Sequence, residues 1–401
     1  MEVSQPADRA WAATSPALDP SIETVVCIPS FRRPQHLRLT LQSLADQRTD
    51  RRFAVVIVEN DALKCESVPA AAEFLGSAKR SGLCVVEPRQ GNCHAINAAF
   101  ETALATFPAA EHFLMIDDDE IASPNWLERM VSTAETTGAD LVGGPVWPDI
   151  HDEMKRGLRR HPAFAPAYQK SGPVPVIYGC GNCLIRRAVF ERVGTPAFDL
   201  RFNFLGGGDT DFFDRCRRLG LRFHWAADAT ISETVPSNRT RFSWLVTRGL
   251  RIGAINYHVQ RKATPTAWSR IKLGLKLLAA LPLSIVYAVQ AVFIERKATI
   301  AVHPMTVALS SLLAAVGIEP QPSRRSHREP VHHRFGSPRR ARRLLAQPGD
   351  GHRPRRDLCR GPAAGLGFAA AVRRSEQHAD RRCHDRQCGD DLIWLTPGSR
   401  C

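Results

Sequence analysis

The chain lacks several features that would place it in a simple class. Its first residues contain no basic stretch followed by an apolar run, so we expect no secretory signal peptide and a cytosolic start. Its eleven cysteines are scattered, which argues against a disulfide framework and predicts reduced thiols. One C-x-x-C, Cys180 to Cys183, has no partner pair to complete a zinc site, so we expect two small buried residues beside a turn.

Lysine is absent from residues 321–401, although this segment contains 18 Arg and 8 acidic residues. The segment therefore supplies +10 of the chain's formal net charge of +14. It is rich in Arg and Pro and has neither helical nor strand periodicity, which predicts a disordered tail. Three interpretations stay open: G+C-rich DNA translated out of frame, which we favour, a genuine disordered tail, and a basic module. We expect no nucleic-acid partner.

Strand and helix patterns alternate through residues 24–145, as is typical of a parallel sheet. The expected strands are 24–28, 53–58, 83–86 and 112–116, and the expected helices are 35–46, 92–106 and 123–136. Every strand ends in a polar loop. Since ligands bind outside the carboxyl ends of such strands, these loops predict one shared crevice. The fold class is therefore α/β, with a mostly parallel, Rossmann-like sheet and helices on both faces.

The pattern after residue 145 is less regular. We expect strands at 174–178 and 221–225 and helices at 212–219 and 242–261. These elements suggest four segments along the chain. They are a disordered N-terminus at 1–21, an α/β domain at 22–262 whose pattern changes after residue 145, membrane-associated apolar helices at 263–320, and the tail at 321–401.

Two stretches without charge follow the domain, at residues 277–294 and 298–318. The first is at the short limit for a membrane span, and basic residues flank both of its ends. We favour a helical hairpin that lies in, or dips into, the cytoplasmic leaflet. A true span and a pair of buried soluble helices are the alternatives.

Acidic residues gather at two places. Asp117, Asp118 and Asp119 follow an apolar run, and Gly206 to Asp211 contains a second pair of aspartates. Adjacent carboxylates at a strand end repel one another unless a cation is present. Mg²⁺ or Mn²⁺ carrying a diphosphate would supply that cation, because such ions take few protein carboxylates and bind phosphate oxygens. Asp209 and Asp211 could instead be only a helix N-cap.

An ordered set of motifs gives a more specific prediction. The motifs are Val25 to Pro34, Ile57 to Asp61, Gln90-Gly91 with Asn97-Ala98, Phe113 to Glu120, Gly181-Asn182, Gly206 to Phe213, and Glu233 to Pro236 with Arg239. With these motifs in this order, the sequence resembles glycosyltransferase family 2 with the GT-A fold, and most of all the succinoglycan-type bacterial exopolysaccharide glucosyltransferases. The resemblance covers about residues 22–260 and implies a glycosyltransferase domain at 22–262, with a nucleotide-binding half (22–145) and an acceptor half (146–262).

The resemblance implies roles for individual residues. Asp209 would be the catalytic base, with Asp211 beside it as a second catalytic or acceptor contact. Asp119 and Asp117 would hold the metal. Asn182, Glu233 and Trp244 would face the acceptor, although Trp244 has a core packing role as its alternative. The nucleotide-sugar would contact Pro29, Ser30, Arg32, Asn60, Asp61, Gly91, Asn97, Asp117, Asp118, Arg248 and Arg251.

The implied activity is inverting, metal-dependent transfer of a hexose, with glucose from a UDP-sugar as the expected donor, onto a lipid-linked oligosaccharide. The expected location is the cytoplasmic face of the inner membrane, in a polysaccharide assembly complex. Two departures from the family pattern matter: Ile96 stands where an Arg is usual, and Gly208 where a Glu is common. A catalytically weak sugar-nucleotide-binding scaffold and a nucleotidyltransferase are the alternatives, although Pro29 to Pro34 lacks the glycines of a phosphate loop.

Overall fold

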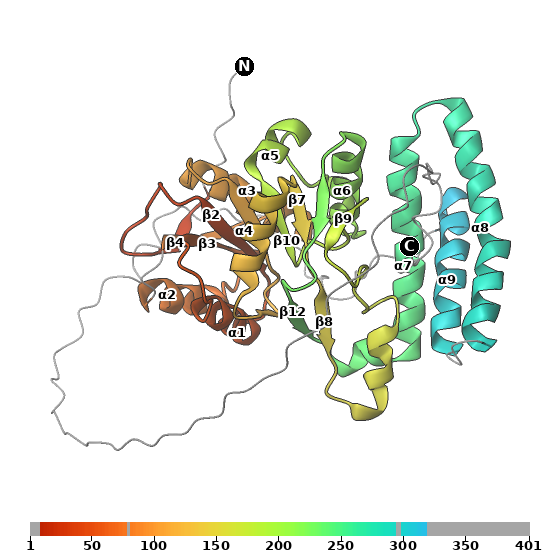
Figure 1. Cartoon of the computed structure of the whole chain (residues 1–401), viewed down its shortest axis with the longest axis horizontal. Coiled ribbons are helices and arrows are strands. Elements are labelled where there is room, and N and C mark those ends of the chain that lie inside the picture. The colour runs from red at the N-terminus through yellow and green to blue at the C-terminus, as the bar shows by residue number, and fades with distance from the viewer. Residues whose placement is uncertain (1–8, 78–80, 294–297, 319–401) are drawn as a thin grey trace, which may run out of the picture. The chain divides into compact units, whose positions relative to one another are not determined.

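A nine-stranded mixed sheet, in the order β1-β4-β3-β2-β5-β10-β7-β11-β9, is the centre of the computed structural model (Figure 1). The structure describes residues 9–77, 81–293 and 298–318, so the tail at 321–401 lies outside it. The strands of this sheet are β1 (Trp11–Thr14), β2 (Thr24–Ser30), β3 (Phe53–Glu59), β4 (Ser81–Val86), β5 (His112–Met115), β7 (Leu141–Gly143), β9 (Gly172–Val174), β10 (Cys183–Arg186) and β11 (Phe223–Trp225).

The four strands β4, β3, β2 and β5 are parallel, as their β-branched, fully buried sequences predict. Strand β10 then runs antiparallel to both β5 and β7, so the sheet as a whole is mixed. The chain order reverses at β2, which has β3 on one side and β5 on the other. A reversal of this kind opens a crevice at the carboxyl ends of the two strands, where ligands bind in α/β proteins.

Alternate residues of β2 enter two separate cores, one on each face of the sheet. Val25 and Cys27 face a core that includes Phe100 of α3, and Val26 and Ile28 face a core that includes Trp126 of α4. Helices therefore cover both faces, which confirms the expected α/β fold class. The helices of this part are α1 (Pro34–Ala45), α2 (Val68–Ser77), α3 (Asn92–Thr106), α4 (Trp126–Thr137), α5 (Arg187–Val193) and α6 (Gly208–Arg218).

A second sheet of three strands, in the order β6-β12-β8, adjoins the end of β5. Its strands are β6 (Glu120–Ala122), β8 (Val146–Asp149) and β12 (Ile231–Thr234). Residues 231 and 233 pair with residues 122 and 120, so this small sheet brings Glu233 beside Glu120. Short 3-10 helices occur at η1 (Glu153–Arg160), η2 (Leu200–Phe202) and η3 (Ser237–Thr240).

Three helices end the described chain: α7 (Phe242–Ala263), α8 (Ala267–Phe293) and α9 (Ala298–Ala315). Helix α9 packs against both α7 and α8. The approach of α7 to α9 is close, because a Cβ on Gly253 would lie 2.3 Å from the Val307 carbonyl oxygen. The Ser311 hydroxyl also donates to the Gly253 carbonyl at 2.8 Å. Residues 277–293 and 298–315 of the two apolar stretches noted in the sequence are thus helical.

Two expectations about local structure are wrong. Residues 11–14 are not disordered but form β1, because they pair with the edge strand β4 and Arg9 forms ion pairs with Glu87 and Glu101. The strand expected at 174–178 lies instead at 172–174. This strand lies at the edge of the sheet, where Pro173 is tolerated, and Pro175 removes a second backbone donor directly after it.

Candidate active site

The aspartate triplet lies at the end of β5, beside the end of β2. Ser30 Oγ and the Phe31 N–H donate to Asp118 Oδ2 at 2.9 and 3.1 Å, and Arg33 Nη1 donates to Asp118 Oδ1 at 3.1 Å. Asp118 is buried, and both of its oxygens are occupied by these donors. Its carboxylate therefore joins the two loops that border the crevice, and its contact with the nucleotide-sugar stays a prediction.

Arg33 also binds the next carboxylate of the triplet. Its Nη1 lies 2.5 Å from Asp119 Oδ2, and its side chain is 40% exposed whereas that of Asp119 is 12% exposed. Burial acts to lower the pKa of Arg33, but the charges of Asp119, Asp118 and Asp117 outweigh it and raise that pKa. The guanidinium is the local counter-charge of the triplet, a role that sequence patterns alone do not distinguish from ordinary loop charge.

Asp117 remains short of positive charge. Burial, followed by the charges of Asp119, Asp118 and Glu233, raises its pKa to about 8. Neighbouring Glu120 is buried, and burial together with Asp117 raises its pKa well above the ordinary value. Carboxylates this crowded indicate a place where a cation would be stabilising.

The donor set can be tested against a divalent ion. Within residues 9–77, 81–293 and 298–318, no group of three or more His, Cys, Asp or Glu side chains could hold a metal ion alone. Mg²⁺ and Mn²⁺ are commonly held by one or two carboxylates, with phosphate oxygens and water completing the shell. Asp117 and Asp119 fit such an ion when a diphosphate accompanies it.

Asp209 is in the first turn of α6, which begins four residues earlier than expected, at Gly208. Gly206 and Gly207 have φ values of 86° and 82°, which a residue with a Cβ rarely adopts, and they turn the chain into the helix. Asp209 Oδ1 accepts from the N–H of Thr210 at 2.8 Å. Among the residues that the structure describes, Asp209 forms no ion pair, so its carboxylate is available to a ligand.

Shared neighbours place Asp209 near the triplet. After burial, the charges of Asp209 and Asp117 both raise the pKa of the Cys183 and Cys180 thiols. The pKa of Arg248 of α7 is lowered by the protein atoms that surround its guanidinium and by Arg251 and Arg239, while the charges of Asp209 and Glu233 act to raise it. The base candidate, the acidic cluster and the α7 arginines therefore lie close enough to act on the same side chains.

Two of the predicted acceptor residues lie at this site. Arg239 Nη1 donates to Glu233 Oε1 at 2.6 Å, and burial together with Asp119 raises the pKa of Glu233. Trp244 precedes Arg248 by one turn of α7, and its ring stacks on Phe164 with centroids 5.6 Å apart. Their acceptor contacts stay predictions.

The predicted nucleotide loops lie at the ends of β2 and β3 and at the start of α3. Pro29 is buried in β2, and Arg32 Nε lies 2.5 Å from Asp61 Oδ2. Burial acts to raise the pKa of Asp61, but Arg32 outweighs it and lowers that pKa. Gly91 precedes α3, and Arg251 lies beside Gly206.

Four residues with predicted ligand contacts have side chains that bond within the protein, and their ligand contacts stay predictions. Asn60 donates to the carbonyls of Glu87 and Arg89 and accepts from the Gly91 N–H. Asn97 both donates to and accepts from the backbone of Phe198, at 2.8 Å each.

The other two of these residues lie in the acceptor half. Asn182 accepts from Trp126 Nε1 at 2.8 Å and donates to the carbonyls of Pro145 and Ala229. Asp211 is fully buried, and its oxygens accept from Arg215 and Lys262. These polar side chains hold loops and helices together. Sequence patterns alone do not distinguish this structural role from contact with a ligand.

Known proteins resemble this chain over most of its described length. Residues 25–194 match the family described as glycosyl transferase family 2. The succinoglycan biosynthesis protein ExoM of Rhizobium meliloti (strain 1021) is 32% identical over 271 residues, which cover 65% of this chain and 84% of that protein. The glucosyl-dolichyl phosphate glucuronosyltransferase of Haloferax volcanii is 26% identical over 247 residues, which cover 57% of this chain and 73% of that protein.

Among solved structures, the mannosyltransferase PcManGT from Pyrobaculum calidifontis, in complex with GDP-Man and Mn²⁺, matches with a TM-score of 0.47 and 18% identity. The match covers 76% of this chain and 91% of that one. The family match and the relationship to ExoM carry the assignment: this chain belongs to glycosyl transferase family 2, with the α/β GT-A fold that the sequence resemblance implied.

Proposed function

We propose that this glycosyltransferase moves a hexose, with inversion, from a UDP-sugar to a lipid-linked saccharide acceptor in exopolysaccharide biosynthesis. The observation that carries the proposal is the placement of Asp209, a carboxylate without an ion-pair partner among the described residues, in the same surroundings as the Asp117–Asp119 triplet. Membership of the family supports the reaction class, and the name of ExoM supports the polysaccharide context.

Departure of the nucleotide diphosphate is the first demand on the site. Negative charge develops on the leaving phosphate oxygen, and groups fixed in advance around that oxygen stabilise it. Arg248 and Arg251, one turn apart on α7, would supply positive charge from the protein. A divalent ion held by Asp117 and Asp119 would neutralise the diphosphate when bound.

Deprotonation of the acceptor hydroxyl is the second demand. As the acceptor oxygen forms its bond to the anomeric carbon, the bond from that carbon to the phosphate oxygen breaks, and the hydroxyl proton passes to Asp209. One displacement without an enzyme nucleophile inverts the anomeric configuration. Glu233 and Trp244 would contact the acceptor sugar beside Arg248.

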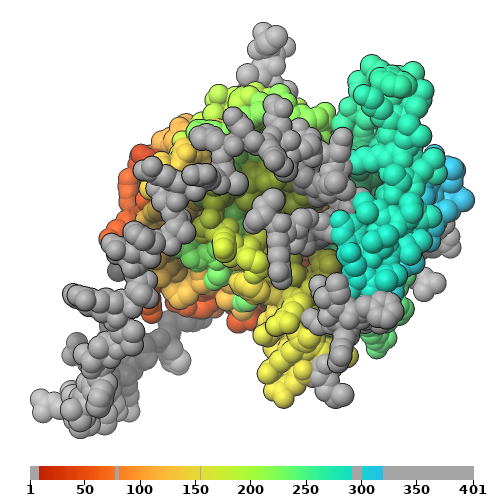
Figure 2. Space-filling model, turned by 45° about the vertical axis from the view of Figure 1, so that its right-hand side comes forward, coloured from red at the N-terminus to blue at the C-terminus, as the bar shows by residue number. Residues whose placement is uncertain are grey.

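A lipid-linked acceptor requires access to a membrane, and α8 supports this part of the proposal. Within the described part of the chain, residues 267–290 form a helical segment that is long and apolar enough to cross a membrane, with a mean hydropathy of 1.6. Trp268, Ile271, Leu275 and Leu278 recur at helical spacing and are each more than half exposed. Arg270, Lys272 and Lys276 lie among them. Figure 2 shows α8 at the surface of the molecule.

This pattern fits a helix that lies in the interface of an anionic cytoplasmic leaflet. Binding to vesicles with and without phosphatidylglycerol would be compared between the unchanged chain and a variant carrying Leu275→Asp and Leu278→Asp. We expect the unchanged chain to float with the anionic vesicles and the variant to remain unbound in the bottom fraction. Equal flotation of both proteins would contradict the membrane part of the proposal.

The reaction itself is tested by incubating the protein with Mn²⁺, radiolabelled UDP-glucose and membranes that carry lipid-linked saccharide. We expect label in the organic-soluble lipid fraction, and NMR of the released saccharide should give a β-linked product from the α-linked donor. Label in pyrophosphate exchange, with none in lipid, would instead support a nucleotidyltransferase. Donor binding without turnover in a screen of UDP-sugars would support a scaffold.

A further inference from the structure

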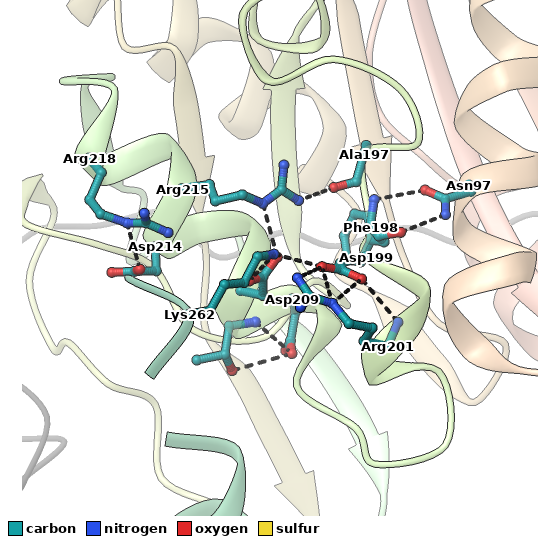
Figure 3. Close-up of polar contacts among 12 residues, drawn as sticks. Asn97, Ala197, Phe198, Asp199, Arg201, Asp209, Asp214, Arg215, Arg218 and Lys262 are labelled. Carbon is teal, nitrogen blue, oxygen red and sulfur yellow. Dashed lines mark hydrogen bonds and ion pairs between the residues drawn. The ribbon is translucent and has the colours of Figure 1, made fainter. Parts of the chain in front are cut away.

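Residues 197–203, here called the strap, connect three parts of the site. The strap lies just before the turn into α6, and its residue Phe198 is hydrogen-bonded to Asn97 of α3 (Figure 3). Arg215 of α6 donates to the carbonyl of Ala197. The strap therefore joins the helix of the nucleotide-binding half to the helix that carries Asp209.

The last residue of the strap reaches the start of α3. Asn203 Oδ1 accepts from the N–H groups of Cys93 and His94, at 3.0 and 3.4 Å, and its Nδ2 donates to the Gln90 carbonyl at 3.0 Å. N–H groups in the first turn of a helix have no partner within the helix. Asn203 thus caps α3 from a position more than 100 residues away in the sequence.

Lys262, near the end of α7, is the point where the strap, α6 and α7 meet. Its Nζ lies 2.7 Å from Asp199 Oδ2 of the strap (Figure 3). The same Nζ lies 2.7 Å from Asp211 Oδ1 of α6. Asp211 has no exposed surface and Lys262 is only 23% exposed, so this pair is held largely out of water. Arg215 binds the other oxygen of Asp211 at 2.9 Å.

We propose that Lys262 is a positioning residue for transfer: by holding Asp199 and Asp211 together, it fixes the α6 turn that carries Asp209 relative to the arginines of α7. The inference rests on the proposed function, because it assigns Asp209 as base and Arg248 as a phosphate contact. Lys262 itself touches neither substrate.

The geometry favours this role over simple charge neutralisation. Arg215, on the same helix as Asp211, already forms an ion pair with it, and Arg201 forms an ion pair with Asp199. Lys262 is the cation that bridges the two carboxylates from a different helix. Asp209 and Asp211 share the first turn of α6, so a shift of Asp211 moves the base. A shift of about 1 Å in a reacting group can slow a reaction by about 100-fold.

The test compares Lys262→Met with two variants chosen for contrast. Lys262→Arg keeps the charge, and Arg201→Met removes the exposed cation from Asp199 while leaving Asp211 untouched. For each protein, kcat and the donor KM of transfer, the affinity for UDP with Mn²⁺ by calorimetry, and the thermal midpoint would be measured. Hydrogen exchange would report the protection of residues 197–218.

We expect Lys262→Met to lower kcat about 10- to 100-fold while the affinity for UDP with Mn²⁺ changes less than about threefold. Lys262→Arg should recover much of kcat, and Arg201→Met should stay within about twofold of the unchanged chain, because exposed pairs contribute little. Faster exchange in residues 197–218 should accompany the loss in Lys262→Met. Adding Asp211→Asn to Lys262→Met should cost less than the sum of the two single changes.

The inference is overturned if Lys262→Met keeps the unchanged kcat, or if it loses UDP affinity in proportion to kcat. A loss that follows only the thermal midpoint, without recovery in Lys262→Arg at a temperature where both variants are folded, would also overturn it. A different result would show that the proposed function is wrong. The unchanged chain would then transfer no sugar, or Asp209→Asn would remain fully active.

Discussion

The carboxamide of Asn203 fills the space that a side chain at position 91 would need. A Cβ on Gly91 would lie 2.1 Å from Asn203 Nδ2, and Gly91 has a φ of 129°. The two residues are 112 positions apart in the sequence, yet the cap that Asn203 places on α3 depends on glycine at 91. The start of α3 and the segment before Asp209 are therefore built as one unit.

Gly91→Ala tests this relationship. The methyl group would displace Asn203 from the first turn of α3 and strain the backbone, so we expect a loss of about 1–3 kcal/mol in the free energy of unfolding. Urea unfolding followed by circular dichroism would measure it. Gly76→Ala is the matched control, because Gly76 lies in α2 and a Cβ added there would meet no heavy atom within 4 Å. Equal stability of the two variants would contradict the packing described for Gly91.

Replacement of Arg33 should change metal binding in the absence of nucleotide. Arg33 occupies Asp119 Oδ2 at 2.5 Å, so it competes with a divalent ion for that oxygen. We expect Arg33→Met to lower the thermal midpoint without metal and to show a larger rise in the midpoint on addition of Mn²⁺. The control is Arg32→Met, since Arg32 binds Asp61 instead. A smaller Mn²⁺ response in Arg33→Met than in the control would exclude the competition.

Acid should weaken the anchoring of the N-terminal strand through Glu87. Its side chain is 1% exposed; burial acts to raise its pKa, but Arg89 and Arg9 lower it to about 2 from an ordinary value of 4.5. Because the folded-state pKa lies below the unfolded one, the charged form stabilises the fold above pH 4.5. That stabilisation, on the order of 3 kcal/mol, is lost as the pH falls from 4.5 towards 2.

Unfolding of the unchanged chain and of Glu87→Gln would be compared at pH 7, 4.5 and 3. We expect Glu87→Gln to be less stable at pH 7 and to lose less on acidification, because it has no carboxylate to protonate. Parallel pH profiles for the two proteins would show that the Arg9–Glu87–Arg89 contacts contribute no pH-dependent stability.

Regular sequence patterns predicted the secondary structure of the parallel strands most accurately. The alternation of β-branched strands and apolar-faced helices predicted β2, β3, β4 and β5, and the polar ends of those strands predicted where the site lies. The shorter strands β7, β10 and β12 have three or four residues, too few for a pattern to emerge. β10 nevertheless runs antiparallel to its neighbours in the main sheet, and β12 brings Glu233 beside Glu120.

Contacts between distant residues could not be predicted in the same way. Asp209 and Asp211 lie two residues apart in one motif, but only the fold distinguishes the partly exposed carboxylate from the one buried against Lys262. The same holds for Asn97 and Asn182, whose amides form hydrogen bonds within the protein.

Ile96 and Gly208, the two residues that depart from the family pattern, are both closely packed. Ile96 is fully buried in the core on the α3 side of the sheet, and a Cβ on Gly208 would lie 2.7 Å from the Cys93 sulfur. A larger residue at 208 would have to displace Cys93, which precedes Ile96 by one turn of α3. Both positions are thus occupied by residues that suit a close approach of α3 and α6.

The decisive measurement is a comparison of Asp209→Asn and Asp119→Asn in sugar transfer and in Mn²⁺-dependent UDP binding. If Asp209 is the base and Asp119 serves the metal and diphosphate, Asp209→Asn will lose about 100-fold or more in kcat and still bind UDP with Mn²⁺. Asp119→Asn will lose that Mn²⁺-dependent binding. Transfer at the unchanged rate by Asp209→Asn, or unchanged Mn²⁺-dependent UDP binding by Asp119→Asn, would contradict the division of labour between the two carboxylates.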